Sequence, residues 1–265
     1  MSIIPKIFKN AVVPIGITLT DGTIKWIGTG FFVVRHVKQD KLCLFLITNR
    51  HVFIGKSGVK ISMKELNTEK MKIVDASLTQ HGNPLYFLHP NTDIDIAVLP
   101  LNPDFIESNN LEFPAFDIDE NGMTSLELRE NGADEGSLVY MLGYTLGLVN
   151  ENSHYPICRL GCIARISEAQ IKEEFNILVD IQNFQGNSGS PIILRPDIIS
   201  LKGTKHVDKC VLVGIVHSYI LFEDTLRSSA TDRVVEVRSE NSGIAQAHPV
   251  EFIREIIDKI APKVS

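Results

Sequence analysis

Residues 12–48 read VVPIGITLTDGTIKWIGTGFFVVRHVKQDKLCLFLIT, and this stretch decides the fold class. Runs rich in β-branched and aromatic residues alternate with turn residues, which is typical of consecutive short β-strands. Asp21-Gly22 predicts a hairpin turn between strands over 12–19 and 23–27, because these residues tolerate the positive φ angles of such turns. Further strands are expected over 28–34 and, almost continuously apolar, over 41–48.

The same alternation continues through most of the chain. From Pro249 onward, however, apolar residues recur at helical spacing, which predicts one closing helix with Pro249 at its first position. The remaining strands are expected over residues 59–63, 73–78, 85–88, 94–99, 137–142, 159–167, 175–181, 190–194 and 211–218. The sequence therefore predicts an all-β protein with a C-terminal helix.

The strands fall into two groups of similar size. Between them lies a stretch with two prolines, several acidic residues and two Asn-Gly pairs, which is typical of a connection between domains. About six strands on each side are enough for a small closed barrel. We expect an N-terminal β-barrel over 1–102, a linker over 103–135, a C-terminal β-barrel over 136–248 and the helix over 249–265.

Composition narrows the possible functions. The chain has 265 residues, of which 44% are hydrophobic, so disorder is excluded as its main state. The formal net charge of −6 argues against nucleic acid or an anionic membrane as the main partner. Four cysteines in so long a chain are expected to be free thiols, and the first ten residues contain no uninterrupted apolar run. These features predict a cytoplasmic protein.

Four segments carry residues that suit nucleophilic catalysis. A serine hydroxyl is a weak nucleophile, and it needs a base to take its proton and a third group to orient that base. Ser188, His51 and Asp95 can fill these three roles. The segments that contain them, together with one further strand, are ITNRHV (47–52), DIDIAVL (93–99), GNSGSP (186–191) and LVGIVHS (212–218).

Together these segments resemble the chymotrypsin-like (trypsin-like) serine proteases. The resemblance is closest to the bacterial HtrA-like and related intracellular trypsin-like peptidases, whose histidine also follows Thr-Asn and precedes Val. The order His, Asp, Ser along the chain is that of the chymotrypsin class. Because the resemblance also takes in residues 28–31, 142–147 and 242–245, it covers almost the whole chain. It implies two six-stranded antiparallel β-barrels with the active site in the cleft between them.

The resemblance also implies a role for each site residue. His51 is the general base, Asp95 orients it, and Ser188 attacks a peptide bond to form an acyl-enzyme, with no metal or organic cofactor. The amides of Gly186 and Ser188 form the oxyanion hole. Asn187 stands where trypsin has the aspartate that pairs with a newly formed amino terminus. We therefore predict that activity does not require N-terminal processing.

The substrate is expected to be a protein or peptide that joins residues 215–219 as an added β-strand. Gln182 occupies the position of trypsin's pocket aspartate, which predicts a preference for an uncharged side chain. The predicted substrate-binding residues are Gln182, Asn183, Phe184, Gln185, Val216, His217, Ser218 and Tyr219. Any regulatory protein partner is unknown, and no PDZ-like segment follows the helix, so the behaviour of full HtrA proteases is not implied.

Several alternatives remain open at this stage. Asp93 is a rival for the orienting role. The fold could serve as a catalytically silent or latent peptide-binding or scaffold module. An α/β-hydrolase esterase is less favoured, because its G-x-S-x-G motif fails at Ser190. Residues 117–122 imitate half of a calcium loop that lacks its final glutamate, and the cysteines are poorly spaced for zinc.

Overall fold

In the computed structural model, the described residues are 3–37, 41–150, 155–197, 203 and 205–264. The N-terminal strands form an eight-stranded sheet in the order β5-β4-β1-β2-β3-β9-β8, and β10 pairs in parallel with β2. The strands of this sheet are β1 (Val12–Thr18), β2 (Ile24–Val37), β3 (Lys41–Thr48), β4 (Gly58–Lys64), β5 (Met71–Ser77), β8 (Phe87–Leu88), β9 (Ala97–Leu101) and β10 (Phe116–Asp117). A separate pair is formed by β6 (Thr79–Gln80) and β7 (Asn83–Pro84).

The C-terminal strands close into a six-stranded barrel in the order β11-β12-β13-β16-β15-β14, with every pair antiparallel. Its strands are β11 (Leu138–Gly143), β12 (Ile157–Arg165), β13 (Ile177–Asp180), β14 (Pro191–Leu194), β15 (Val211–Arg227) and β16 (Val234–Pro249). The helices are α1 (Lys6–Asn10), α2 (Arg50–Phe53), α3 (Pro103–Ser108), α4 (Ile118–Asn121), α5 (Ser125–Glu130), the 3₁₀ turn η2 (Thr145–Gly147), α6 (Glu168–Glu174) and α7 (Val250–Val264). The prediction of a mostly β chain with a closed six-stranded barrel and a C-terminal helix is confirmed.

The structure differs from the sequence prediction in several respects. The N-terminal strands form an eight-stranded sheet where a six-stranded barrel was expected, and the short helices α1 to α6 were not predicted. The strands expected over 23–27 and 28–34 form the single strand β2. The whole of β16 was not predicted, because its first half mixes valines with charged residues and buries no face. Helix α7 begins at Val250, while Pro249 still belongs to β16 and pairs with Gly214.

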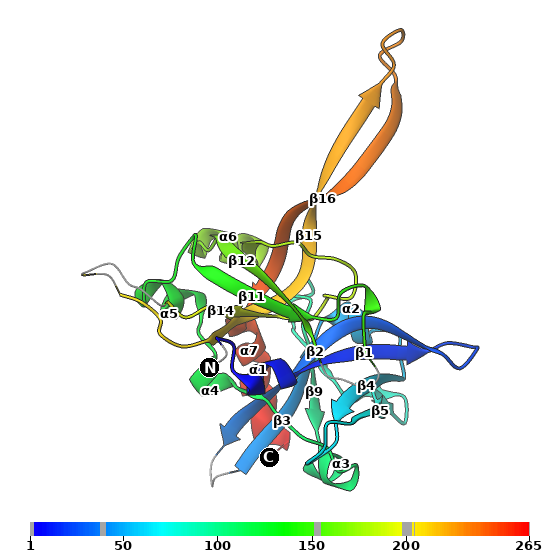
Figure 1. The fold of residues 1–265 in the computed structure, drawn as a ribbon, viewed down its shortest axis with the longest axis vertical. Coiled ribbons are helices and arrows are strands. Elements are labelled where there is room, and N and C mark those ends of the chain that lie inside the picture. Colours follow the sequence, from blue (N-terminus) through cyan, green and yellow to red (C-terminus); the bar gives the residue numbers. More distant parts are fainter. Residues whose placement is uncertain (1–2, 38–40, 151–154, 198–202, 204, 265) are drawn as a thin grey trace.

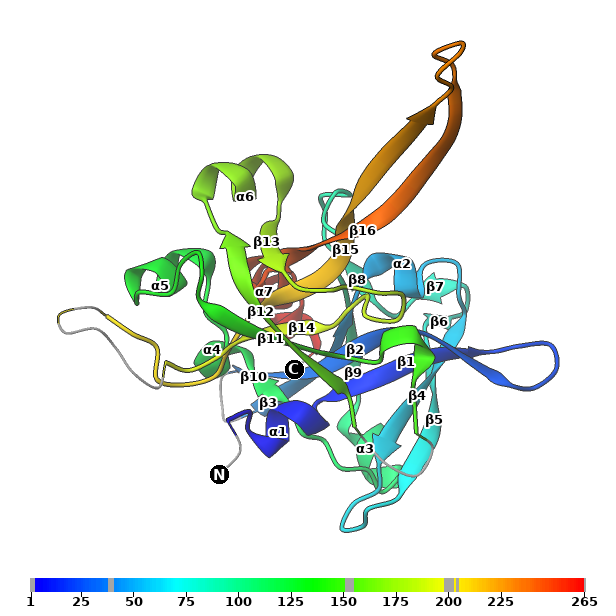
Figure 2. The same ribbon diagram turned by 45° about the horizontal axis from the view of Figure 1, so that its top comes forward.

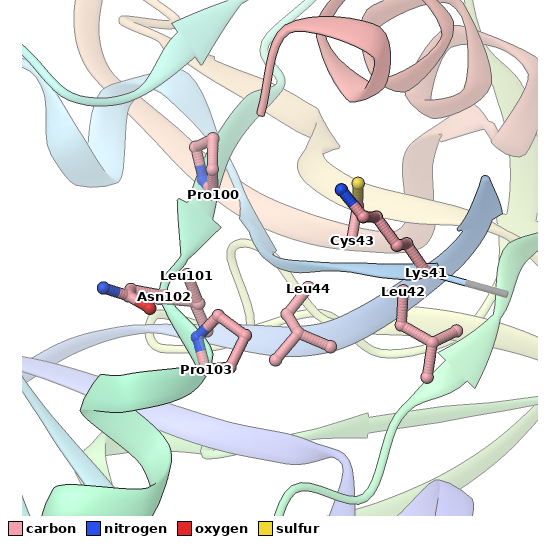
Figure 3. A pocket seen from close by; sticks show the side chains of 8 residues that line it. All are labelled: Lys41, Leu42, Cys43, Leu44, Pro100, Leu101, Asn102 and Pro103. Atoms are coloured by element: carbon pink, nitrogen blue, oxygen red, sulfur yellow. The ribbon is translucent and has the colours of Figure 1, made fainter. Parts of the chain in front are cut away.

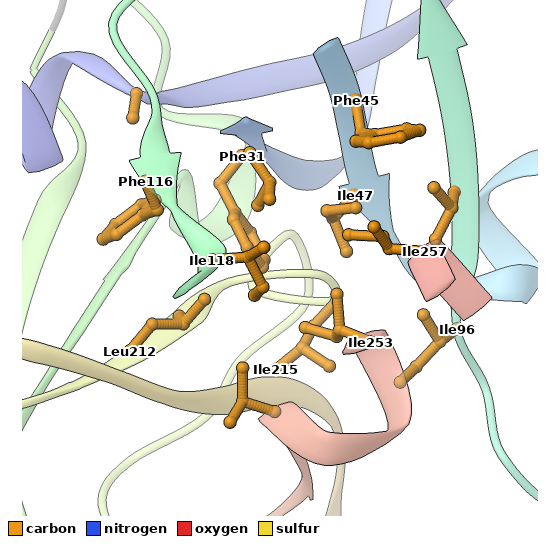
Figure 4. Close-up of a cluster of buried hydrophobic side chains, with 14 of the residues drawn as sticks. Phe31, Phe45, Ile47, Ile96, Phe116, Ile118, Leu212, Ile215, Ile253 and Ile257 are labelled. Carbon is orange, nitrogen blue, oxygen red and sulfur yellow. The ribbon is translucent and has the colours of Figure 1, made fainter. Parts of the chain in front are cut away.

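A shared core joins the N-terminal sheet, the C-terminal barrel and α7. The helix presents one apolar face, and its buried residues pack against side chains from both strand units. Figure 4 shows Ile253 and Ile257 of this helix among Phe31, Ile47, Ile96, Leu212 and Ile215. Burial of apolar surface is the main source of stability. The two units are therefore held against each other by the same helix that ends the described chain.

Strands β15 and β16 continue beyond the barrel as a two-stranded hairpin. In Figure 1 and Figure 2 this hairpin projects away from the rest of the molecule. Its register runs from Leu221 opposite Asn241 to Arg227 opposite Val234.

Candidate active site

His51 lies immediately after strand β3, in the short helix α2. The loop that carries Asp95 is tied to the start of that helix, because the side-chain amide of Asn49 donates to the Asp95 carbonyl at 2.8 Å. The carboxylate of Asp95 receives two further hydrogen bonds, from His51 Nδ1 at 2.6 Å and from the His51 backbone N–H at 3.0 Å. Each carboxylate oxygen therefore holds a different part of His51. Asp93, the rival orienter, is exposed and makes no such contact among the described residues.

The carboxylate of Asp95 is kept in its charged form. Burial by itself would raise the pKa of Asp95, but the hydrogen bonds and charge of His51 more than offset it, so the pKa lies below its usual range. His51 itself has a half-exposed side chain, with 51% of its surface accessible. A fixed carboxylate beneath an accessible imidazole is the arrangement that a general base requires.

Two histidines of the C-terminal barrel, the fully buried His248 and the half-buried His217, stand behind Asp95. His248 donates from Nδ1 to the Phe175 carbonyl at 2.7 Å, so its Nε2 accepts the hydrogen bond of the Asp95 backbone N–H at 2.9 Å. The ring of His217 stacks on that of His248, with centroids 4.0 Å apart, and its Nε2 contacts Asn176 Oδ1 at 2.7 Å. Burial lowers the pKa of both histidines, to about 3 for His217. Both rings are therefore neutral.

Ser188 lies in the turn between β13 and β14, and this turn is bonded to the N-terminal sheet. The Thr29 backbone N–H donates to the Ser188 carbonyl at 2.8 Å, and the Thr29 hydroxyl donates to the Gly186 carbonyl at 2.7 Å. Thr48, three residues before His51, donates its hydroxyl to the Thr29 carbonyl at 2.7 Å. These bonds bring the Ser188 turn to the end of β3, where the chain enters α2.

Gly28 marks how closely the two units meet at this point. A Cβ atom at Gly28 would lie 3.2 Å from the Ser188 carbonyl oxygen and 3.0 Å from a methyl group of Val52. Val52 directly follows His51 in α2. The backbone of Ser188 and the helix of His51 therefore lie on either side of one glycine, so the structure brings the three residues predicted as a triad to the same seam.

The turn around Ser188 leaves two backbone donors available. Gly186 has a φ angle of 96°, which favours glycine. The Gln185 carbonyl accepts a hydrogen bond from Leu146 N–H at 2.6 Å, which directs it away from the amides that follow. Within the described part of the chain, neither Gly186 N–H nor Ser188 N–H has an acceptor. Unpaired backbone N–H groups are rare in buried turns, and two of them one residue apart suit a developing oxyanion.

Asn187 is anchored inside the protein. Its side chain is only 1% exposed, and its Oδ1 accepts a hydrogen bond from the Thr145 hydroxyl at 2.8 Å. Its Nδ2 has no hydrogen-bond partner in the described structure. The Oδ1 of Asn187 is therefore already paired with a neutral hydroxyl of the same barrel.

The predicted substrate-binding residues lie around this turn, but in different environments. Asn183 is buried and donates to the Ser218 carbonyl at 3.0 Å, whereas Gln182, Phe184 and Gln185 have exposed side chains. Val216 is buried, His217 and Ser218 are half-buried, and Tyr219 is exposed.

Arg159 of β12 lies beside a predicted substrate-binding residue, and the sequence analysis did not single it out. Its guanidinium lies over the Phe184 ring, 5.0 Å from the centroid. The residue is far from the motifs in sequence, and only barrel closure places it there.

The residues that tie the site together were also missed. Thr29 and His248 take part in hydrogen bonds between the two strand units, and Thr48 holds Thr29 within the N-terminal sheet. The two threonines lie inside quoted motifs, but their spacing carried no sign of this role.

A separate pocket of about 510 Å³ lies at the opposite ends of β3 and β9 from His51 and Asp95. Figure 3 shows its lining, which is mostly aliphatic and includes Lys41, Cys43, Leu44, Pro100 and Leu101. Burial raises the pKa of the Cys43 thiol, so this thiol is a poor nucleophile. The pocket contains no nucleophile paired with a base, and we do not assign the site to it.

Comparison with known proteins gives a family match, which covers all three candidate catalytic residues. The family model described as "Trypsin-like peptidase domain" matches residues 28–196, which include His51, Asp95 and Ser188. A search of curated proteins finds no match. No helix in the described part of the chain combines the length and apolar character needed to cross a membrane.

Proposed function

The chain belongs to the trypsin-like peptidase family, and on that premise we propose that it is a serine endopeptidase that hydrolyses peptide bonds through an acyl-enzyme. The observation that carries the proposal is the pair of hydrogen bonds that the Asp95 carboxylate accepts from His51, next to a Ser188 turn with two unpaired amides. A scaffold module would not need an accessible imidazole held in this way.

In the proposed reaction, Ser188 Oγ forms a bond to the scissile carbonyl carbon while its proton passes to Nε2 of His51. The negative oxygen of the tetrahedral intermediate accepts hydrogen bonds from Gly186 N–H and Ser188 N–H. The carbon–nitrogen bond then breaks as His51 returns the proton to the leaving amine. Water repeats the sequence on the acyl-enzyme, which releases the second product and restores Ser188.

Asp95 supports this cycle electrostatically. Its carboxylate accepts the hydrogen bond from His51 Nδ1, which leaves Nε2 free to face the serine. Because the pKa of Asp95 lies below its usual range, the carboxylate stays charged while His51 carries the extra proton. The charge pair stabilises the imidazolium that forms in the transition state.

We also propose a preference for an uncharged side chain at the cleaved position. The wall of the proposed pocket combines the Asn183 amide, Phe184 and the cation of Arg159 above it, with Gln182 beside Gly243. An arginine or lysine side chain would find no carboxylate among these residues. We propose a cytoplasmic location as well, because all four cysteines are free thiols.

Labelling with a fluorophosphonate probe tests the proposed function. Wild-type protein should react, and Ser188→Ala, His51→Ala and Asp95→Asn should lower the rate by a factor on the order of 10³ or more. Asp93→Asn is the matched control and should react like the wild type. An unreactive, correctly folded wild type would favour the binding module. Labelling that persists in Ser188→Ala would favour an esterase that uses another serine.

A further inference from the structure

The hairpin formed by the outer halves of β15 and β16, residues 219–241, is the largest feature that the proposed catalysis does not use. Both strands extend beyond the barrel, and Figure 1 and Figure 2 show the hairpin standing free of the rest of the molecule. Its large apolar side chains are all more than one third exposed, and they are Tyr219, Ile220, Leu221, Phe222, Leu226, Val234, Val235 and Val237.

Such a hairpin needs an explanation. A two-stranded hairpin that has neither a third strand nor another element packed on it is only marginally stable in water. Contiguous exposed apolar residues usually mark a binding surface. Phe222 is 58% exposed and Val235 is 70% exposed. The hairpin therefore has the composition of a surface that receives another polypeptide.

The outer edge of β15 begins beside the nucleophile. β14 pairs with β15 only as far as Ile215, and the last bonds on this edge join Val216 to Gly189 and Ser190, one and two residues after Ser188. Beyond Val216 no described strand pairs with this edge. The edge then runs outward over Tyr219–Arg227, a span of roughly 30 Å at the usual rise of a strand.

We propose that the β15 edge over Tyr219–Arg227 binds an extended, apolar segment of the polypeptide substrate by strand addition. This proposal rests on the proposed peptidase function and specifies its substrate class: unfolded segments with several apolar residues on one side of the scissile bond. A peptide that pairs with residues 217–219 of β15 can continue to pair with the same strand edge along the hairpin. Main-chain hydrogen bonds would supply affinity, and contacts with Phe222 and Leu226 would supply the apolar preference.

The polarity of pairing determines which side of the scissile bond is bound. Every strand pair of the C-terminal barrel is antiparallel. An added strand that follows this pattern runs opposite to β15. Because β15 leads away from Ser188 toward its C-terminal end, the substrate residues along the hairpin are those on the amino-terminal side of the cleaved bond.

The outer edge of β16 provides a built-in control. It carries equally exposed residues such as Val235 and Val237. This edge, however, begins next to β13, where Asp180 pairs with Ile244 and Ile181 N–H donates to the Gly243 carbonyl. It does not lead to Ser188, so a substrate aligned for cleavage does not reach it.

The first experiment measures kcat/KM for four fluorogenic peptides with the same cleavage sequence. One is short, one has alternating Val-Ser residues added on the amino-terminal side, one has the same residues added on the carboxyl-terminal side, and one has Gly-Ser on the amino-terminal side. The amino-terminal Val-Ser peptide should be cleaved at least about tenfold more efficiently than the other three. An equal gain from the Gly-Ser peptide, a gain only from the carboxyl-terminal extension, or no gain would overturn the proposal.

Variants of the hairpin then test which strand is responsible for the gain in kcat/KM. In one variant, an Asn-Gly turn replaces residues 222–240 and joins Leu221 to Asn241, which pair with each other in the hairpin. The ratio of kcat/KM for the amino-terminal Val-Ser peptide to kcat/KM for the short peptide should then fall to about one. The double variant Phe222→Glu/Leu226→Glu should lower this ratio in the same way, whereas Val235→Glu/Val237→Glu should keep it. Equal losses in both double variants would contradict the assignment to β15.

Binding to the Ser188→Ala protein separates this inference from the proposed catalysis. Fluorescence anisotropy of the labelled Val-Ser peptide should show binding that is lost when the hairpin is shortened, even if the wild type reacts with no fluorophosphonate. Sedimentation velocity tests the alternative that a second copy of this chain covers the hairpin in place of the substrate. A dimer that depends on the hairpin, together with an unchanged peptide ratio in the shortened variant, would refute strand addition by the substrate.

Discussion

At the residue scale, the most unusual feature is the pair of stacked, neutral imidazoles behind Asp95. His248 is fully buried and must remain neutral to accept the Asp95 backbone N–H, because its other nitrogen donates to the Phe175 carbonyl. The half-buried ring of His217 stacks on it, with the two ring centroids 4.0 Å apart. Both rings come from the C-terminal barrel, whereas Asp95 comes from the N-terminal sheet. The position of Asp95 thus depends on uncharged groups of the other unit.

This arrangement predicts that the protein loses stability in mild acid. Burial lowers the pKa of folded His217 to about 3, whereas an unfolded histidine has a pKa near 6.5, so only the unfolded state takes up the proton between these values. The contribution is fully present above about pH 6.5 and falls as the pH decreases, by about 1.4 kcal/mol at about pH 5.5. Urea unfolding of wild type and His217→Gln at about pH 7.5 and pH 5.5 measures it.

Glutamine is the matched replacement because its side-chain amide can still donate to Asn176 Oδ1. His217→Gln should therefore lose about 1.4 kcal/mol less than wild type between the two pH values, while His248 continues to contribute in both proteins. An identical pH dependence in the two proteins would show that His217 is not held neutral by burial.

At the scale of elements, α7 does more than cover one barrel. Its residues Ile253 and Ile257 are fully buried in the core shared by the N-terminal sheet and the C-terminal barrel. Since His51 and Asp95 come from one unit and Ser188 from the other, packing of this helix bears directly on their alignment. A helix at the end of the chain thus contributes to a site whose motifs all precede it.

We predict that Ile253→Ala lowers the free energy of unfolding by about 2–5 kcal/mol, because it leaves a cavity where two strand units and a helix meet. Fluorophosphonate labelling of the folded variant should also slow, because the contact between the N-terminal sheet and the C-terminal barrel loosens. Lys259→Ala, on the exposed face of the same helix, is the control and should change stability by less than about 0.5 kcal/mol. Thermal melts and labelling rates of the two variants compare these effects, and equal losses would mean that the effect is not one of core packing.

At the scale of the whole molecule, the N-terminal segment packs at a place unrelated to Asn187. Phe8 of α1 stacks near Phe116, with ring centroids 4.5 Å apart, and the Ile3 carbonyl accepts from the Cys210 thiol. Asn187 is instead satisfied by Thr145 within the C-terminal barrel. In the described structure, the side-chain oxygen of Asn187 is thus satisfied by Thr145 and not by the N-terminal segment.

An N-terminal extension of about twenty residues should therefore leave kcat/KM within about twofold of the untagged protein, provided that the tag lies outside the packed residues. Removal of the tag should not increase the activity. A loss of a hundredfold or more on tagging, restored by cleavage, would instead show that a free amino terminus orders the site.

The sequence alone determined the features that follow from local chemistry. The apolar run over 41–48 predicted β3 with the bounds that the structure has, because a buried strand needs a continuous apolar stretch. The order of His51, Asp95 and Ser188 together with their flanking residues identified the candidate triad, since motif residues are adjacent in the chain. Local patterns could not predict β16, whose first half mixes exposed valines with charged residues and buries no face.

Only the tertiary structure decided which distant groups meet. The bond from His248 to Asp95, the docking of Thr29 against the Ser188 turn and the Arg159 guanidinium over Phe184 each join residues that lie many positions apart in the chain. No periodicity or motif encodes such contacts, because they arise when the barrel closes and α7 buries the faces of both units together. The tertiary structure also decides that the hairpin edge leads away from Ser188, because this depends on where β14 stops pairing with β15.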